Sequence, residues 1–120
     1  GGQSMSQSQK PPAAPSKGVN PKQMVSLESF VVNLSRSQRS HYLKVTLKLH
    51  MSSPEYATNA GKYTPKIRDA LIILLSNQSV EDLRSMEGKY QLKRQIVSRV
   101  NNVMGQEMVT DVFFSDFVIQ

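Results

Sequence analysis

The stretch HYLKVTLKLHM, residues 41 to 51, decides the fold more than any other part of this 120-residue chain. Apolar residues occupy every second position in it, which is the period of a β-strand with one buried face. The apolar set is Leu43, Val45, Leu47, Leu49 and Met51, and the alternating set is Tyr42, Lys44, Thr46, Lys48 and His50. The sequence therefore predicts a long, half-buried strand.

The stretch just before it predicts a partner strand. Residues 27 to 34, LESFVVNL, place Phe30, Val32 and Leu34 on one face and Val31 on the other. The polar segment SRSQRS, residues 35 to 40, separates the two strands. Two strands joined by a short polar turn indicate an antiparallel hairpin.

The stretch after it predicts helices. Ser53-Pro54-Glu55 is typical of a helix start, because Ser caps free backbone N–H groups and Pro is tolerated in the first turn. Thr64-Pro65 indicates either a kink or a second helix start. Beyond it, one helix face is apolar and consists of Ile67, Ala70, Leu71, Leu74 and Leu75. Ile72 falls within the opposite, polar face, which holds Arg68, Asp69 and Ser76.

The last third of the chain predicts a long helix and a final strand. After a short helical turn opened by Ser79, a helix is expected from 86 to 104, ended by Gly105 as its C-cap. Its predicted core stripe is Leu92, Ile96, Val100 and Val103. In residues 108 to 120, alternation puts Val112, Phe114 and Val118 on one side and Phe113, Phe117 and Ile119 on the other. Bulk on both faces predicts a strand that is central or buried on both sides.

The resulting order of β, β, α, α, β predicts an α+β domain at 23–120, with a small, mostly antiparallel sheet and helices on one face. Residues 1–22 are interpreted as a tag remnant, Gly1 and Gly2, followed by a flexible Pro/Ser-rich linker. The linker holds four of the six prolines and no acidic or aromatic residue. The longest apolar run, residues 70 to 75, is far shorter than the roughly 20 residues that span a bilayer.

Composition and spacing argue against catalysis. The chain has no Cys, no Gly-rich phosphate loop and no Gly-x-Ser-x-Gly elbow. His41 and His50 are nine residues apart, so in one strand they would lie on opposite faces, too far apart to share a metal ion. Asp111 and Asp116 are five residues apart in the last predicted strand, and this odd spacing also puts them on opposite faces. We therefore predict a non-enzyme with no catalytic residue, metal site or cofactor.

The net charge of +6 leaves open an anionic partner, and a small basic nucleic-acid-binding domain is the alternative function. Three of the 15 basic residues lie in the linker, which leaves 12 against 9 acidic residues in the domain. The basic residues of the long helix, Lys89, Lys93, Arg94 and Arg99, form no stripe. The strand face with Tyr42, Lys44 and Lys48 is a better candidate for single-strand binding, although the simpler interpretation is the solvated face of an edge strand.

Two segments carry a family resemblance over residues 25 to 120. They are YTPKIRDALIILLSNQSVEDLRSMEGKYQLKRQIVSRVNNVMG, residues 63 to 105, and VTDVFFSDFVIQ, residues 109 to 120. Their most specific pieces are Pro65 with Ile67-Arg68-Asp69-Ala70, the Leu-Leu-Ser near Leu74, the helix from Leu92 to Gly105, and the terminal run itself. With these segments the chain resembles the FliL family of flagellar basal-body-associated proteins.

The resemblance implies a stomatin-like (SPFH-like) fold in a single-pass protein of the bacterial inner membrane. The domain would lie in the periplasm at the flagellar basal body, after a transmembrane helix that is missing here. The implied partners are flagellar stator proteins of the MotA/MotB or PomA/PomB type, basal-body components and further copies of the protein in a ring, with no nucleic acid. The implied role is to support recruitment, stabilisation or activation of stator units, and so motility and torque.

Two contact hypotheses join the residues to this resemblance. Ile72, apolar on a polar helix face, is expected to contact a neighbouring protomer or a stator. The face with Lys44, Lys48 and His50 is expected to meet an anionic surface, either of a neighbouring protomer or of an acidic stator segment.

Overall fold

A computed structural model of the chain describes residues 18–120. The predicted tag remnant and most of the predicted linker, residues 1–17, lie outside the described residues. The described part begins with a 3-10 turn, η3 (Pro21–Gln23), which includes two residues that we had placed in the linker.

The sheet is three strands wide, with β3 (Tyr42–Met51) in the middle. Two short strands, β1 (Met24–Ser26) and β2 (Phe30–Asn33), lie end to end along one edge of β3, and β4 (Val109–Ile119) pairs with its other edge. All pairings are antiparallel, which confirms the predicted hairpin of β2 and β3. The strand β1 was not predicted.

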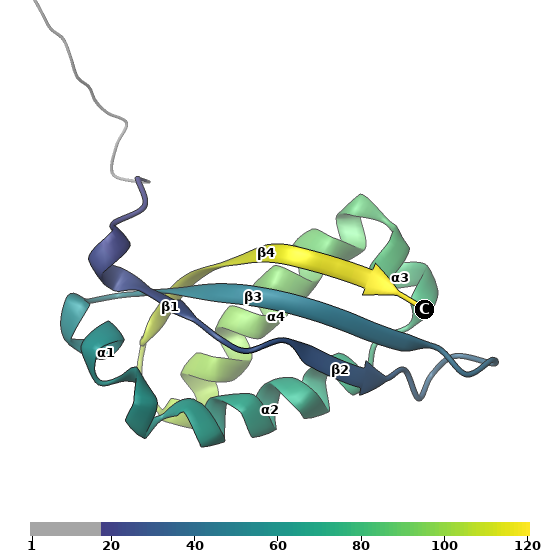
Figure 1. The fold of residues 1–120 in the computed structure, drawn as a ribbon, viewed down its shortest axis with the longest axis horizontal. Helices are drawn as coiled ribbons and strands as arrows, with labels where there is room; N and C mark the ends of the chain where they lie inside the picture. Colours follow the sequence, from purple (N-terminus) through teal and green to yellow (C-terminus); the bar gives the residue numbers. More distant parts are fainter. Residues whose placement is uncertain (1–17) are drawn as a thin grey trace, which may run out of the picture.

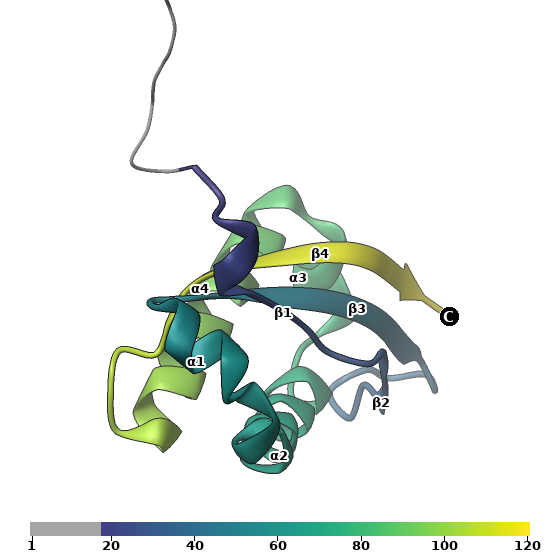
Figure 2. The same cartoon turned by 60° about the vertical axis from the view of Figure 1, so that its left-hand side comes forward.

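The helices between β3 and β4 cover one face of this sheet, as Figures 1 and 2 show. They are α1 (Pro54–Thr58), the 3-10 turn η4 (Ala60–Lys62), α2 (Thr64–Ser76), α3 (Val80–Arg84) and α4 (Met86–Met104). The prediction of an α+β domain with a small antiparallel sheet is therefore confirmed.

The sequence signals at the helix ends have the expected structural roles. The Ser53 hydroxyl accepts a hydrogen bond from the Tyr56 backbone N–H at 3.2 Å, which caps α1. Thr64-Pro65 begins a new helix, α2. Pro is tolerated in its first turn, because backbone N–H groups there have no hydrogen-bond partner within the helix. Gly105 has a φ of 71° at the C-cap of α4, a left-handed conformation that favours glycine.

The core lies between β3 and the two long helices. All five apolar residues of β3 are fully buried. The five predicted core residues of α2 are also buried, with at most 7% of any of them exposed. In α4, Leu92, Ile96 and Val100 are buried as predicted, but Val103 is only half-buried and its place in the core stripe is wrong. Asn101 is buried instead, because the end of α4 packs against backbone at the start of β4.

The predicted position of the last strand in the sheet is also wrong. Within residues 18–120, β4 pairs only with β3, so it is an edge strand rather than a central one. Phe113, Phe114 and Phe117 are half-buried, and Val118 is 40% exposed. Conversely β3 is central, so the interpretation of its polar face as that of an edge strand is wrong as well.

A β-bulge in β4 explains why simple alternation failed there. The register pairs Leu47 with Phe114 but Thr46 with Asp116, which leaves Ser115 as the extra residue. Beyond the bulge the side chains change faces. As a result Phe114 and Phe117 both face the core side, with ring centroids 5.3 Å apart in an edge-to-face arrangement.

Candidate interaction surfaces

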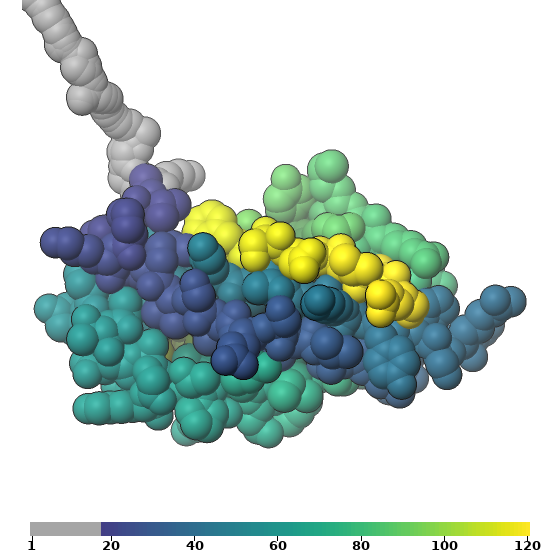
Figure 3. Space-filling view, viewed as in Figure 1, coloured from purple at the N-terminus to yellow at the C-terminus, as the bar shows by residue number. Residues whose placement is uncertain are grey.

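The first candidate surface is the open face of the sheet, which none of the α-helices among residues 18–120 covers and which Figure 3 shows. It is built from the alternate residues of β3, so Lys44 and Lys48 point outward and are exposed. Val31 pairs with Lys44 from one side and Val118 pairs with it from the other. With Tyr42, these residues give one end of the open face an apolar character.

Acidic residues balance the lysines on this face. Because of the bulge, Asp111 lies opposite His50 and Asp116 lies opposite Thr46, so both carboxylates share the face of Lys44 and Lys48. The prediction that the two aspartates lie on opposite faces is therefore wrong. Within residues 18–120 the only ion pair closer than 4 Å joins Arg94 and Glu87, at 3.6 Å on the surface. The open face is thus a mixed-charge surface rather than a basic one.

His50 lies at the edge of this face in a small hydrogen-bond network. Its Nδ1 lies 2.7 Å from the Thr110 hydroxyl oxygen, and the Asn20 backbone N–H donates to its Nε2 at 3.4 Å. Thr110 donates its hydroxyl proton to the His50 carbonyl at 3.1 Å. Since Nε2 accepts and the hydroxyl proton is already used, Nδ1 is the protonated nitrogen. His50 therefore connects β3, β4 and the start of the described chain. His41 lies just before β3 rather than in it.

The second candidate surface is the outer side of α2. Ile72 is 43% exposed there, on the polar face where the sequence placed it, and Ile73 beside it is 57% exposed. Sequence reasoning missed Ile73. The signal was present, because five consecutive apolar residues, 71 to 75, cannot all face one core at 100° per residue.

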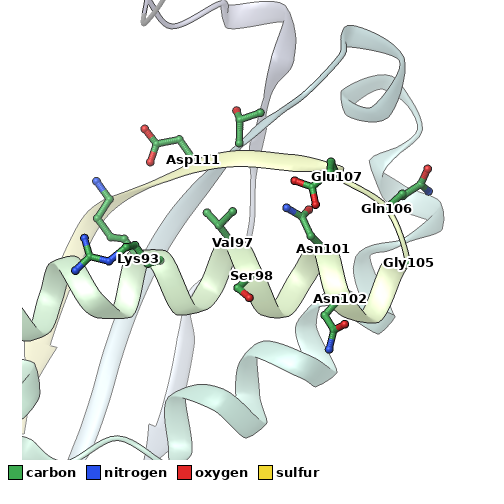
Figure 4. A pocket seen from close by; sticks show the side chains of 11 residues that line it. Lys93, Val97, Ser98, Asn101, Asn102, Gly105, Gln106, Glu107 and Asp111 are labelled. Carbon is green, nitrogen blue, oxygen red and sulfur yellow. The ribbon is translucent and has the colours of Figure 1, made fainter.

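The third candidate surface is a groove between α4 and β4. At one end it opens into a pocket of about 920 Å³, lined by α4, the turn at Gly105 and the start of β4, as Figure 4 shows. At the other end it narrows to a pocket of about 290 Å³ beside the middle of β4. Both pockets include Lys93, so they adjoin each other along α4 and β4, and we refer to them together as the groove. We did not predict this surface from the sequence. The groove exists only where α4 extends past the edge of the sheet, and that depends on how the helix and the strand pack.

The geometry offers no arrangement for metal chemistry in the described part of the chain. Among residues 18–120, no three His, Cys, Asp or Glu side chains gather closely enough to hold a metal ion. No helix in this range combines the length and the apolar character needed to cross a bilayer.

Comparison with known proteins gives the same family as the resemblance. The family of flagellar basal body-associated FliL proteins matches residues 24–120. The flagellar protein FliL of Aquifex aeolicus is 32% identical over 91 residues, which cover 76% of this chain and 56% of that protein. The Escherichia coli protein of the same name is 32% identical over 98 residues, covering 78% of this chain and 62% of the relative.

A relative of lower identity also matches most of this chain. The flagellar FliL protein of Caulobacter vibrioides is 29% identical over 94 residues, which cover 78% of this chain and 46% of that protein. The chain thus spans less than two thirds of the length of these relatives. The family match covers every strand and every α-helix described above, from the start of β1 to the end of the chain. On this match the chain belongs to the FliL family of flagellar basal-body-associated proteins.

Proposed function

We propose that this chain is the periplasmic domain of a single-pass inner-membrane protein that supports the stator units of the flagellar motor. In this role it helps to recruit, stabilise or activate stators without catalysing a reaction, and it assembles with further copies into a ring. The stomatin-like fold implied by the resemblance belongs to the same proposal. The observation that carries it is the family match over 24–120.

The arrangement of exposed surfaces supports a role in assembly. A ring forms when one surface of a protomer binds a different surface of the next, so each protomer needs at least two separate contact surfaces. The chain offers α2, with Ile72 and Ile73, and the open sheet face, with Lys44, Lys48 and His50. The helices cover the other face of the sheet, so these two surfaces point in different directions. We assign the protomer and stator contacts to them.

The α2 contact is tested by Ile72→Asp in the full-length protein, expressed in the motile bacterium that encodes it. A carboxylate at a closely packed apolar contact would have to be desolvated, so ring assembly and swimming speed should both fall. Val19→Asp is the matched control, since Val19 is 52% exposed and lies outside both surfaces. Unchanged swimming and intact rings with Ile72→Asp would remove α2 from the proposal.

The sheet-face contact is tested by reversing two charges together, Lys44→Glu and Lys48→Glu. If the partner surface is acidic, stator association should weaken, and more strongly at low salt, where charges are screened less. Lys62→Glu with Arg84→Glu is the control, because both residues are exposed and lie in η4 and α3, outside the two surfaces. Equal stator association in the two double variants would contradict this assignment.

The alternative of a nucleic-acid-binding domain gains no support. The family is described as flagellar and basal-body-associated. On the strand face that was its best candidate, Asp111 and Asp116 accompany the two lysines, which opposes the approach of a phosphate backbone.

A further inference from the structure

The outer edge of β4 carries backbone groups without strand partners in the described part of the chain. Gln120 exchanges both backbone hydrogen bonds with Tyr42 at 2.8 Å, so alternate residues from Gln120 back along β4 bond to β3. The backbone groups of the residues between them, Phe117 and Ile119, therefore point away from β3. Exposed edges of this kind are templates for another strand.

Only the second half of this edge is open. Val112 also directs its N–H outward, but the carboxylate of Asp111 accepts that hydrogen bond at 2.8 Å. This side chain blocks the first half of the edge as a strand template. The open part consequently runs from Phe114 to Ile119, which is a usual length for a short strand.

The narrower, mostly apolar end of the groove lies at the start of this open half, where Phe114 lines it. The first half of α4 extends past β4, and Figure 3 shows green residues of α3 and α4 rising beyond the yellow strand. The pocket of about 290 Å³ between them is lined by Met86 and Tyr90 of α4 and by Phe113 and Phe114 of β4. Met86 is 73% exposed and Tyr90 is 52% exposed. Two such large apolar side chains, one helical turn apart beside an open strand edge, suit contact with another polypeptide.

The charge at this narrower end of the groove indicates what it accepts. The only charged residues that line this pocket are Lys89 and Lys93. Their ammonium groups lie 5.1 Å and 5.3 Å from the ring centroids of Phe117 and Phe113, and no carboxylate among residues 18–120 pairs with them within 4 Å. Two positive charges held over aromatic rings favour an incoming carboxylate.

We propose that the edge of β4 from Phe114 to Ile119 binds an extended, apolar and acidic peptide segment of another protein. The segment adds a strand to the sheet, so its main chain bonds to β4. Its apolar side chains enter the groove beside Met86 and Tyr90, and its acidic side chains meet Lys89 and Lys93. Residues 3–17 of the chain itself fit poorly, since they contain three prolines and two lysines but no acidic residue.

This binding site goes beyond the proposed function and does not depend on it. The surfaces assigned to ring and stator contacts are α2 and the open sheet face, whereas this site uses α4 and the outer edge of β4; it borders the open face at Phe113, which pairs with Lys48, but none of the residues substituted in its test lies on that face. Variants of the two sets are therefore separable, and failure of one proposal leaves the other intact.

The test is a selection of short random peptides, displayed on phage, against the purified chain. Enriched peptides should alternate apolar residues with others and contain at least one acidic residue. Affinity for a synthetic peptide of the consensus should fall at least tenfold with Tyr90→Asp and with the pair Lys89→Glu and Lys93→Glu. It should stay within twofold with Val19→Asp and with the pair Lys62→Glu and Lys66→Glu.

Amide NMR of the same complex locates the peptide. The expected result is a set of shift changes at the backbone N–H groups of Phe117 and Ile119, with slower hydrogen exchange there. No enriched peptide, basic peptides in place of acidic ones, or shift changes confined to the open sheet face or α2 would each overturn the proposal.

Discussion

Arg68 shows at the residue scale how one side chain connects two elements that the sequence treats separately. Its guanidinium donates to the Glu28 carbonyl at 2.7 Å and to the Ser29 carbonyl at 3.3 Å, and it stacks over the Phe30 ring at 4.0 Å. Arg68 thereby fixes α2 to the bend between β1 and β2. The sequence placed Arg68 on the polar face of a helix, but its partners are carbonyls about 40 residues away and have no sequence signature.

Replacing Arg68 should therefore destabilise the domain. Arg68→Ala removes two hydrogen bonds and the cation–π contact, which should cost about 1 to 2 kcal/mol of unfolding free energy because the site is only partly buried. Arg68→Lys should recover little, since Lys lacks the planar fork. Urea denaturation measures the change, with the exposed Lys66→Ala as the control. Equal midpoints for Arg68→Ala and the control would contradict this role.

Asn101 is a buried residue that the pattern of apolar residues did not predict. Its side chain accepts from the backbone N–H groups of Met108 and Val109 at 2.9 and 2.8 Å and donates to the Val109 carbonyl at 2.9 Å. A helical stripe is identified from apolar residues alone, so a buried polar residue that satisfies backbone groups cannot be found by that method. This is why Val103 was predicted in its place.

Asn101→Leu should cost more than any change at Val103. The Leu variant stays apolar but removes the side-chain partner of the Val109 N–H and carbonyl, while the Met108 N–H keeps its hydrogen bond to the Gln106 carbonyl at 2.9 Å; the loss should be about 2 to 4 kcal/mol. Val103→Ala removes half-buried methyl groups and should cost about 1 kcal/mol or less. Thermal and urea unfolding of the two variants give the comparison. A larger loss with Val103→Ala would show that the apolar stripe was the better description.

At the scale of elements, local sequence predicted what local geometry controls. The bounds of α4, the caps at Ser53 and Gly105 and the buried face of α2 were all correct, because capping and amphipathic periodicity depend on neighbouring residues. The predicted places of β3 and β4 in the sheet were wrong, because alternation of apolar residues shows which face of a strand is buried but not which of its edges pairs with another strand. Because of the bulge at Ser115, Phe117 and Asp116 each lie on the opposite face of the sheet from the one that strict alternation predicts.

Gly88 marks a close approach between two elements. A Cβ at this position would overlap the Asp82 carbonyl oxygen and lie 2.7 Å from the Ser85 hydroxyl oxygen, so only Gly lets α4 start this close to α3. Gly88→Ala should therefore destabilise by about 1 to 3 kcal/mol, although Ala normally favours a helix. Gly61→Ala is the control, since its Cβ would meet nothing within 4 Å and the change should be neutral or stabilising by up to about 1 kcal/mol. Similar effects of the two substitutions, measured by urea unfolding, would refute the close approach.

At the scale of the whole molecule, the net charge of +6 says little about partners. What matters is where the charges lie after folding. The bulge sets two aspartates among the lysines of the open sheet face, and Lys89 and Lys93 collect beside the edge of β4. Neither arrangement could be derived from composition, because each brings together residues of different elements. The resemblance to the family, in contrast, could be seen in the segments 63 to 105 and 109 to 120, and the family match over residues 24–120 confirms it.

The central claim is that this domain acts at the flagellar base in contact with stators. The direct measurement is fluorescence imaging of the tagged full-length protein in motile cells, with and without stator genes. We expect foci at the flagellar bases that become dimmer when stators are absent, and weaker foci with Ile72→Asp than with Val19→Asp. Fluorescence spread evenly around the cell envelope, in cells that swim with the tagged protein, would contradict the account.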